Sequence, residues 1–175
     1  MENVDVRPAL IDERPAVENL MQLYAHDFSE NWAGTQRGDV GEDGRFAPYP
    51  LDPYWQDRSH VPLLIRSAGH IAGFALLNDK SHTGDKVDRN VAEFFVLRKY
   101  RRSGIATAAA QTMFSRFPGI WEAAVARKNI AALRFWKRAV ERHPLRMGLS
   151  EIDVQSPDWD GPVLRFGIGC SPVST

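Results

Sequence analysis

The chain has 175 residues and little of what several classes of protein depend on. It contains one cysteine, Cys170, which excludes an internal disulfide and a zinc site built from several cysteines. Its histidines are too scattered to suggest a metal site, so we expect no metal. The 22 Lys and Arg residues equal the 22 Asp and Glu residues. No overall positive field therefore draws the protein to nucleic acid, and any recognition of anions must be local.

Long apolar runs are also missing. The longest, such as residues 71–77, are far too short to span a bilayer. The first residues, MENVDVRPALIDERPAV, lack the basic start and apolar core of a signal peptide. We therefore expect a cytoplasmic protein that does not bind membranes. The length and the hydrophobic content of 43% are typical of one globular domain, which would span residues 1–175.

Hydrophobic periodicity predicts a mixed order of strands and helices. Strands are expected at residues 4–10, in two runs within 61–79 that flank a Ser-Ala-Gly-His turn, and at 91–97, 120–126, 150–154 and 162–168. Helices are expected from Asp12, which can cap the first, after Gly104 and from Asn129. The last of these should bury Ile130, Leu133, Trp136 and Val140. Residues 29–57 show no sustained period, and such a segment is often functional.

Positive charge is concentrated where the strand at 91–97 gives way to a helix, in the run VLRKYRRSGIA. The first amides of a helix have no intrahelical partners, and the helix dipole is positive there. Gly104 lets the backbone approach a ligand closely. These features favour a phosphate or pyrophosphate site on the amides of residues 102–106. The alternative is a tight turn with a solvated basic rim. The spacing matches neither a Walker A loop nor G-x-G-x-x-G.

The same run resembles the pyrophosphate loop of the GNAT superfamily of acyl-CoA-dependent N-acyltransferases. The family signature is Arg or Gln, two residues, Gly, one residue, then Gly or Ala; here Arg101, Gly104 and Ala106 occupy its defined positions. A second family motif, N-x-x-A-x-x-F/L-Y, resembles the run from Asn129 to Trp136. The order of elements is similar over nearly the whole chain. The resemblance implies an α+β fold with a mixed, mostly antiparallel central sheet flanked by helices, in which two parallel strands splay apart to hold CoA.

The resemblance also implies residues for acetyl-CoA. The cofactor-binding residues would be Val96, Arg101, Arg102, Ser103, Gly104, Ile105, Ala106, Thr107 and Asn129. Main-chain groups around Phe94 and Val96 would pair with the pantetheine arm, and the amide of Phe94 would donate to the thioester oxygen. Asn129 would hydrogen-bond the pantetheine, cap its helix, or do both.

Two positions bear on catalysis. Glu93 interrupts an apolar strand, and a buried carboxyl there would have a raised pKa suited to accepting an amine proton. Alternatively, Glu93 begins the strand, faces solvent or pairs with an arginine. Trp136 stands where many relatives have a tyrosine that protonates the leaving thiolate, and an indole is no practical proton source. Either another group supplies the proton, or the thiolate leaves unassisted, or turnover has been lost.

The acceptor pocket is expected at the end of the first helix and in the irregular segment. Its candidate residues are Tyr24, Asp27, Tyr54 and Trp55, because acids beside aromatics suit a cationic amine; otherwise these are surface or packing residues. The resulting hypothesis is an N-acetyltransferase that transfers acetyl from acetyl-CoA to a primary amine, in a small molecule or peptide, by direct attack in a ternary complex. The alternatives are a CoA-binding regulatory or weakly catalytic module and a toxin acting on aminoacyl-tRNA, against which the neutral composition argues. A homodimer is common among relatives.

Overall fold

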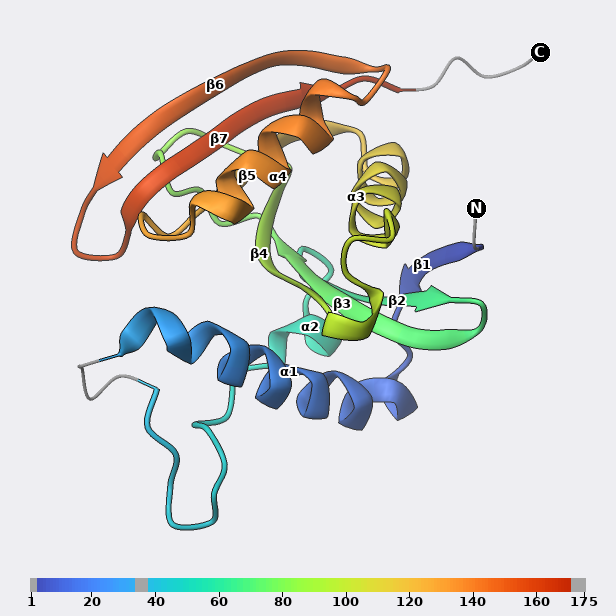
Figure 1. Ribbon diagram of the computed structural model, residues 1–175. Helices are drawn as coiled ribbons and strands as arrows, with labels where there is room; N and C mark the ends of the chain where they lie inside the picture. Colours follow the sequence, from blue (N-terminus) through green and yellow to red (C-terminus); the bar gives the residue numbers. More distant parts are fainter. Residues whose placement is uncertain (1–2, 34–37, 171–175) are drawn as a thin grey trace.

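The computed structural model describes residues 3–33 and 38–170, and within them seven strands form one sheet in the order β1-β2-β3-β4-β5-β7-β6 (Figure 1). The strands are β1 Val4–Pro8, β2 Val61–Ser67, β3 His70–Asn78, β4 Arg89–Val96, β5 Gly119–Ala124, β6 Arg146–Gln155 and β7 Asp160–Ile168. The α-helices are α1 Arg14–Ser29, α2 Pro53–Gln56, α3 Ile105–Arg116 and α4 Ile130–Glu141. Neighbouring strands are antiparallel except β4 and β5, which are parallel. The predicted mixed, mostly antiparallel sheet is confirmed.

Helices cover both faces of the sheet, so the core has two parts. One part packs α3 and α4 against the sheet around Phe114, Trp121 and Trp136. The other packs α1 and α2 around Phe74 and Phe95. In Figure 1, α1 and α2 lie below β2 and β3, α3 lies above these strands, and α4 lies below β6 and β7. Strand β4 contributes side chains to both parts, because successive side chains of a strand point to opposite faces.

The parallel strands β4 and β5 separate soon after they meet. Their pairing is limited to Arg89 with Trp121 and Asn90 with Glu122. Beyond this point β4 continues along β3, and β5 continues along β7. A β-bulge shifts the register of β4 next to Ala92, since Leu76 pairs with Glu93 but Leu77 pairs with Val91. The predicted splay therefore lies beyond Asn90, on the side of the sheet centre that leads to α3.

The start of α1 differs from the prediction that Asp12 caps it. A 3₁₀ turn, Ile11–Glu13, precedes the helix, and the Asp12 side chain makes no capping hydrogen bond. Glu13 instead accepts hydrogen bonds from the Leu10 amide at 3.0 Å and from Arg7 at 2.6 and 2.7 Å. The hydrogen bonds from Arg7 lead the causes that lower the pKa of Glu13 to about 2. An arginine within reach makes the longer Glu13 side chain the better anchor.

The structure differs from the prediction in two further details, the exposure of Ile130 and the length of β6. Ile130 was expected to be buried but is 50% exposed, because the buried face of α4 is formed by Trp136, Ala139 and Val140. Strand β6 is longer than the predicted residues 150–154, since its ladder with β7 runs from Arg146 to Gln155 on an exposed edge that needs few apolar side chains. In the described parts of the chain, no helix has both the length and the apolar character needed to cross a membrane.

Candidate active site

The turn between β4 and α3 presents unpaired amides. A 3₁₀ turn, Arg98–Tyr100, follows β4, and Gly104 begins α3 with a φ of 87°. The first helical hydrogen bond runs from the Ala108 amide to the Gly104 carbonyl, at 2.9 Å. The amides of residues 105–107 therefore have no intrahelical acceptor. A Cβ added at Gly104 would meet no atom within 4 Å, so space lies open beside these donors. The turn fits a phosphate group.

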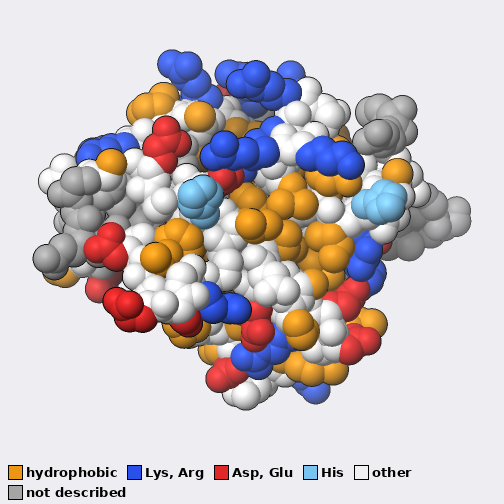
Figure 2. Space-filling view, turned by 60° about the horizontal axis from the view of Figure 1, so that its bottom comes forward, with side chains coloured by type: hydrophobic (Ala, Val, Ile, Leu, Met, Phe, Trp, Pro, Cys, Tyr) orange, Lys and Arg blue, Asp and Glu red, His pale blue; other side chains and the backbone are white. Residues whose placement is uncertain are grey.

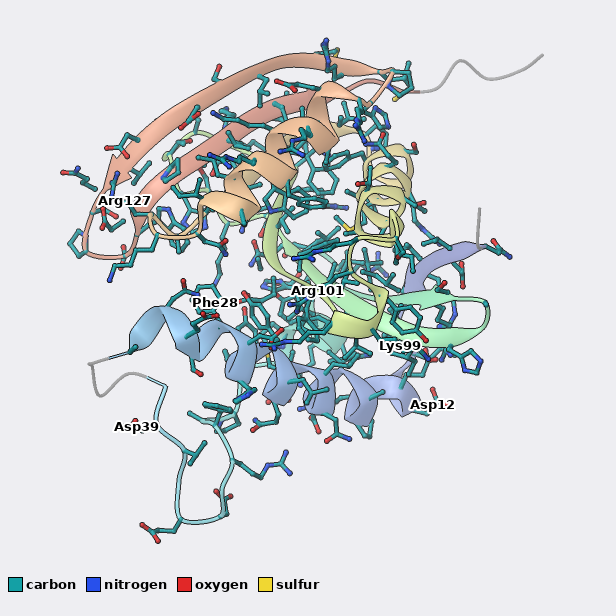
Figure 3. The ribbon with its side chains drawn as sticks, in the orientation of Figure 1. Asp12, Phe28, Asp39, Lys99, Arg101 and Arg127 are labelled. Carbon is teal, nitrogen blue, oxygen red and sulfur yellow. The ribbon has the colours of Figure 1, made fainter. Side chains whose placement is uncertain are left out.

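The arginines of this turn are partly committed to α1. The Arg101 amide donates to the Arg98 carbonyl at 3.2 Å, so it is not free to bind a phosphate. The guanidinium groups of Arg98 and Arg101 form ion pairs with Asp27 near the end of α1. The Nε of Arg101 also donates a hydrogen bond to the Val96 carbonyl, at 2.8 Å. Although burial opposes it, hydrogen bonding by Arg101 and Arg98 holds the pKa of Asp27 below its usual value. Figure 3 shows Arg101 directly above α1. Asp27 thus binds the turn, whereas the sequence suggested that it binds the acceptor.

Positive charge is nevertheless gathered locally. Arg102, Ser103 and Gly104 are exposed, and Ser103 is held in place by its hydroxyl, which donates to the Tyr100 carbonyl at 2.7 Å. On the face in Figure 2, Lys and Arg side chains crowd the upper part, and most Asp and Glu lie lower or to the left. The zero net charge is therefore compatible with a basic region suited to an anionic ligand.

Main-chain groups of β4 point into the splay. The Leu97 amide, just after β4, donates a hydrogen bond to the carbonyl of Ala72 in β3, at 2.9 Å. In an antiparallel ladder the hydrogen-bonding direction alternates, so Phe95 and Glu93 also face β3 while Phe94 and Val96 face away from it. The reach of Arg101 to the Val96 carbonyl agrees with this assignment. Phe94 and Val96 thus have the orientation required by the predicted pairing with pantetheine.

Glu93 lies on the opposite, α1-facing side of β4. Its carboxyl is half-buried and lies beside the hydroxyls of Tyr24 and Tyr49. Burial raises the pKa of Glu93 to about 7, and the two tyrosine hydrogen bonds oppose that rise. Glu93 forms no ion pair within the described residues, which excludes the arginine-paired alternative there. Tyr49 belongs to the irregular segment in which the acceptor pocket is expected.

The other acceptor candidates are divided between two places. Tyr54 is buried and interacts with Tyr49, Asn78 and Glu93. Trp55 instead lies under Arg14 at the start of α1, with the guanidinium carbon 5.6 Å from the ring centroid. The structure therefore groups Tyr24, Tyr49 and Tyr54 around Glu93 and leaves Trp55 outside this group.

Asn129 and Trp136 occupy the start and middle of α4. The Asn129 side chain accepts a hydrogen bond from the Ala132 amide at 3.1 Å, so it caps the helix. Trp136 is 6% exposed and packs against Phe94 and Phe135, at ring-centroid distances of 5.0 and 4.9 Å. The indole thus contacts the strand residue whose amide faces the splay. No group of three or more His, Cys, Asp or Glu that could hold a metal ion occurs among the described residues.

Comparisons with known proteins agree with this geometry. Residues 17–140 match the acetyltransferase (GNAT) family. No curated protein sequence matches the chain. Among solved structures, the chain is similar to the ribosomal-protein-S18-alanine N-acetyltransferase of Escherichia coli, with a TM-score of 0.57, 12% identity and 99% of each chain covered.

Two further structures are similar over most of their length. One is yncA from Salmonella typhimurium, solved with its cofactor acetyl-CoA, with a TM-score of 0.58, 14% identity, and 98% of this chain and 96% of that chain covered. The other is a spermidine N-acetyltransferase SpeG chimera from Vibrio cholerae and hSSAT, with a TM-score of 0.56, 10% identity and 94% of each chain covered. The identities are low, so these likenesses describe the fold. Because the family match spans well over half of the sequence, the chain belongs to the GNAT family of acetyltransferases.

Proposed function

We propose that this protein transfers an acetyl group from acetyl-CoA to a primary amine in a small molecule or peptide. The observation that carries the proposal is the pairing of two neighbours on β4: a carboxyl with a pKa of about 7 at Glu93, and an amide directed into the splay at Phe94. One is suited to accept a proton near neutral pH, and the other to stabilise negative charge on an acyl oxygen.

The residues present fit acetyl-CoA. The diphosphate would bind the unpaired amides of Ile105, Ala106 and Thr107 beside Gly104, with Arg102 and Ser103 at the rim. The pantetheine arm would pair along β4 at Phe94 and Val96, where β5 has turned away. Asn129 would contact it through the amide nitrogen that capping leaves unused. Bound acetyl-CoA supplies an acetyl group activated as a thioester.

In the proposed reaction the acceptor enters from the side of α1. The amine nitrogen forms a bond to the acyl carbon, the carbon–sulfur bond breaks, the amine proton passes to Glu93, and the sulfur leaves as a thiolate. The aromatic rings of Tyr24 and Tyr49 beside the Glu93 carboxylate would favour a cationic amine before it loses its proton. Similar structures named as N-acetyltransferases of ribosomal-protein-S18 alanine and of spermidine support an amine acceptor.

Trp136 favours a second candidate function. Its indole, packed among phenylalanines, cannot deliver a proton to the thiolate. A thiolate is a tolerable leaving group near neutral pH, so unassisted departure is compatible with turnover. A CoA-binding module that lacks turnover would share the same turn and splay. The two functions differ in whether free CoA accumulates.

The test is release of CoA thiol from acetyl-CoA with a panel of primary amines. At least one amine should give turnover, and Glu93→Gln should lower kcat by about 10²–10⁴-fold. The matched control is Glu151→Gln, an exposed carboxyl of β6, which should leave kcat unchanged. Thermal stabilisation by CoA without turnover on any amine would replace the proposal with the CoA-binding module.

A further inference from the structure

A groove of about 330 Å³ lies between α3 and α4, next to the turn that precedes α3. Its lining residues are Thr107, Ala131, Arg134, Phe135, Arg138 and Arg142. The volume is at the lower end for small-molecule sites and accommodates a phosphorylated sugar rather than a large ligand.

The groove has positive charge that no acidic side chain neutralises. Arg134, Arg138 and Arg142 are spaced by four residues, so they follow one another along one side of the helix. None forms an ion pair within the described residues, whereas Lys137 of the same helix pairs with Glu151. The facing helix, α3, contains no Asp or Glu. Like charges at this spacing repel one another, and a bound anion would relieve that repulsion.

The groove adjoins the turn proposed for the diphosphate. Thr107 belongs to both, because its amide is one of the unpaired donors and its side chain lines the groove. Coenzyme A carries its 5′-diphosphate and its 3′-phosphate on the same ribose. A ligand whose diphosphate binds the start of α3 therefore brings a second phosphate close to Thr107.

We propose that this groove binds the 3′-phosphate of coenzyme A, through Arg134 and Arg138 of α4, Arg142 at the C-terminal end of that helix, and the Thr107 hydroxyl. This inference rests on the proposed function. A phosphate monoester has a charge of about −1.5 to −2 at pH 7, and arginine binds it with two parallel hydrogen bonds. These arginines thus make the protein selective for coenzyme A over its 3′-dephospho form.

The test is calorimetric titration of the full chain with CoA and with 3′-dephospho-CoA. The unchanged protein should bind CoA on the order of tenfold more tightly, as expected when charge-assisted hydrogen bonds are lost. The double variant Arg134→Gln, Arg138→Gln should reduce that preference to about twofold or less, while its affinity for 3′-dephospho-CoA stays the same. Circular dichroism and thermal melting establish that the variant is folded.

The matched control is Lys137→Gln, which removes one positive charge from the same helix but faces Glu151 rather than the groove. It should keep the full preference for CoA. Equal binding of the two ligands by the unchanged protein, or equal loss of both in the double variant, would overturn the inference and leave the proposed function intact. Failure of both ligands to bind the unchanged protein would instead overturn the proposed function.

Discussion

The surroundings of Glu93 in the fold set the pKa of the proposed catalytic base. A carboxyl surrounded by tyrosines in the middle of a strand ionises less readily than one in water, because burial penalises its charged form. The tyrosine hydroxyls limit that penalty and hold its pKa at about 7, where a carboxylate can both exist and accept a proton. The same residue next to an arginine would ionise fully and would be a weak base.

This balance predicts the effect of Tyr24→Phe. The Tyr24 hydroxyl donates to Glu93 and lowers its pKa, whereas the ring packs against Phe74 and Phe95. Phenylalanine keeps the packing and removes the hydrogen bond, so the pKa of Glu93 should rise. Activity requires the ionised carboxyl, and the midpoint of its increase with pH should therefore move upward from about 7. At pH 9 the variant should approach the native rate.

The measurement is the pH dependence of kcat/KM with one amine for all proteins, so that the ionisation of the amine is common to them. Tyr100→Phe is the control, because Tyr100 packs under Lys99 at the turn. An unchanged midpoint in Tyr24→Phe, with a uniformly lower rate, would mean that Glu93 is not the titrating base.

At the scale of elements, α1 is tied to the turn before α3 through Asp27. One carboxylate holds two arginines that are 71 and 74 residues away along the chain. Asp27 is mostly buried, but Arg98 and Arg101 are 71% and 42% exposed, so each ion pair contributes about 1 kcal/mol or less. These ion pairs position α1 relative to the turn before α3 and add little to the stability of the fold.

Asp27→Asn should therefore lower the free energy of unfolding by about 1–2 kcal/mol at pH 7. The pKa of Asp27 is lower in the folded than in the unfolded protein, so its contribution is complete above the unfolded value and is lost as pH falls through the folded one. The difference between the proteins should accordingly shrink as the pH falls below about 3.9, the usual pKa of an Asp side chain. Urea unfolding at several pH values measures it.

Asp12→Asn is the control for this effect. Asp12 is exposed and forms no ion pair among the described residues, so its replacement should leave unfolding at pH 7 almost unchanged. If Asp27→Asn lowered the free energy of unfolding equally at neutral and acid pH, the contribution of Asp27 would not come from its ion pairs.

For the whole molecule, the sequence predicts those features that depend on neighbours along the chain. The glycine at the start of α3, the capping Asn129 and the two motifs are local, and they led to the family and the fold. The register of β4 could not be predicted from the sequence, because the bulge at Ala92 arises in the pairing of β4 with β3. The contacts of Asp27 and Glu93 could not be predicted from the sequence either, because they join residues that are more than 40 positions apart.

The central claim is that coenzyme A binds the main-chain donors beside Gly104, and calorimetric titration of Gly104→Glu tests it most directly. The φ of 87° costs any L-residue about 1–2 kcal/mol, and the added carboxylate would repel the diphosphate. Gly84→Glu is a matched control, because Gly84 has a φ of 90° and equally open surroundings in the loop before β4.

Saturable heat from coenzyme A is expected with the native protein and with Gly84→Glu, and none is expected with folded Gly104→Glu. Unaltered binding by Gly104→Glu, or no heat from the native protein at millimolar coenzyme A, would contradict the central claim.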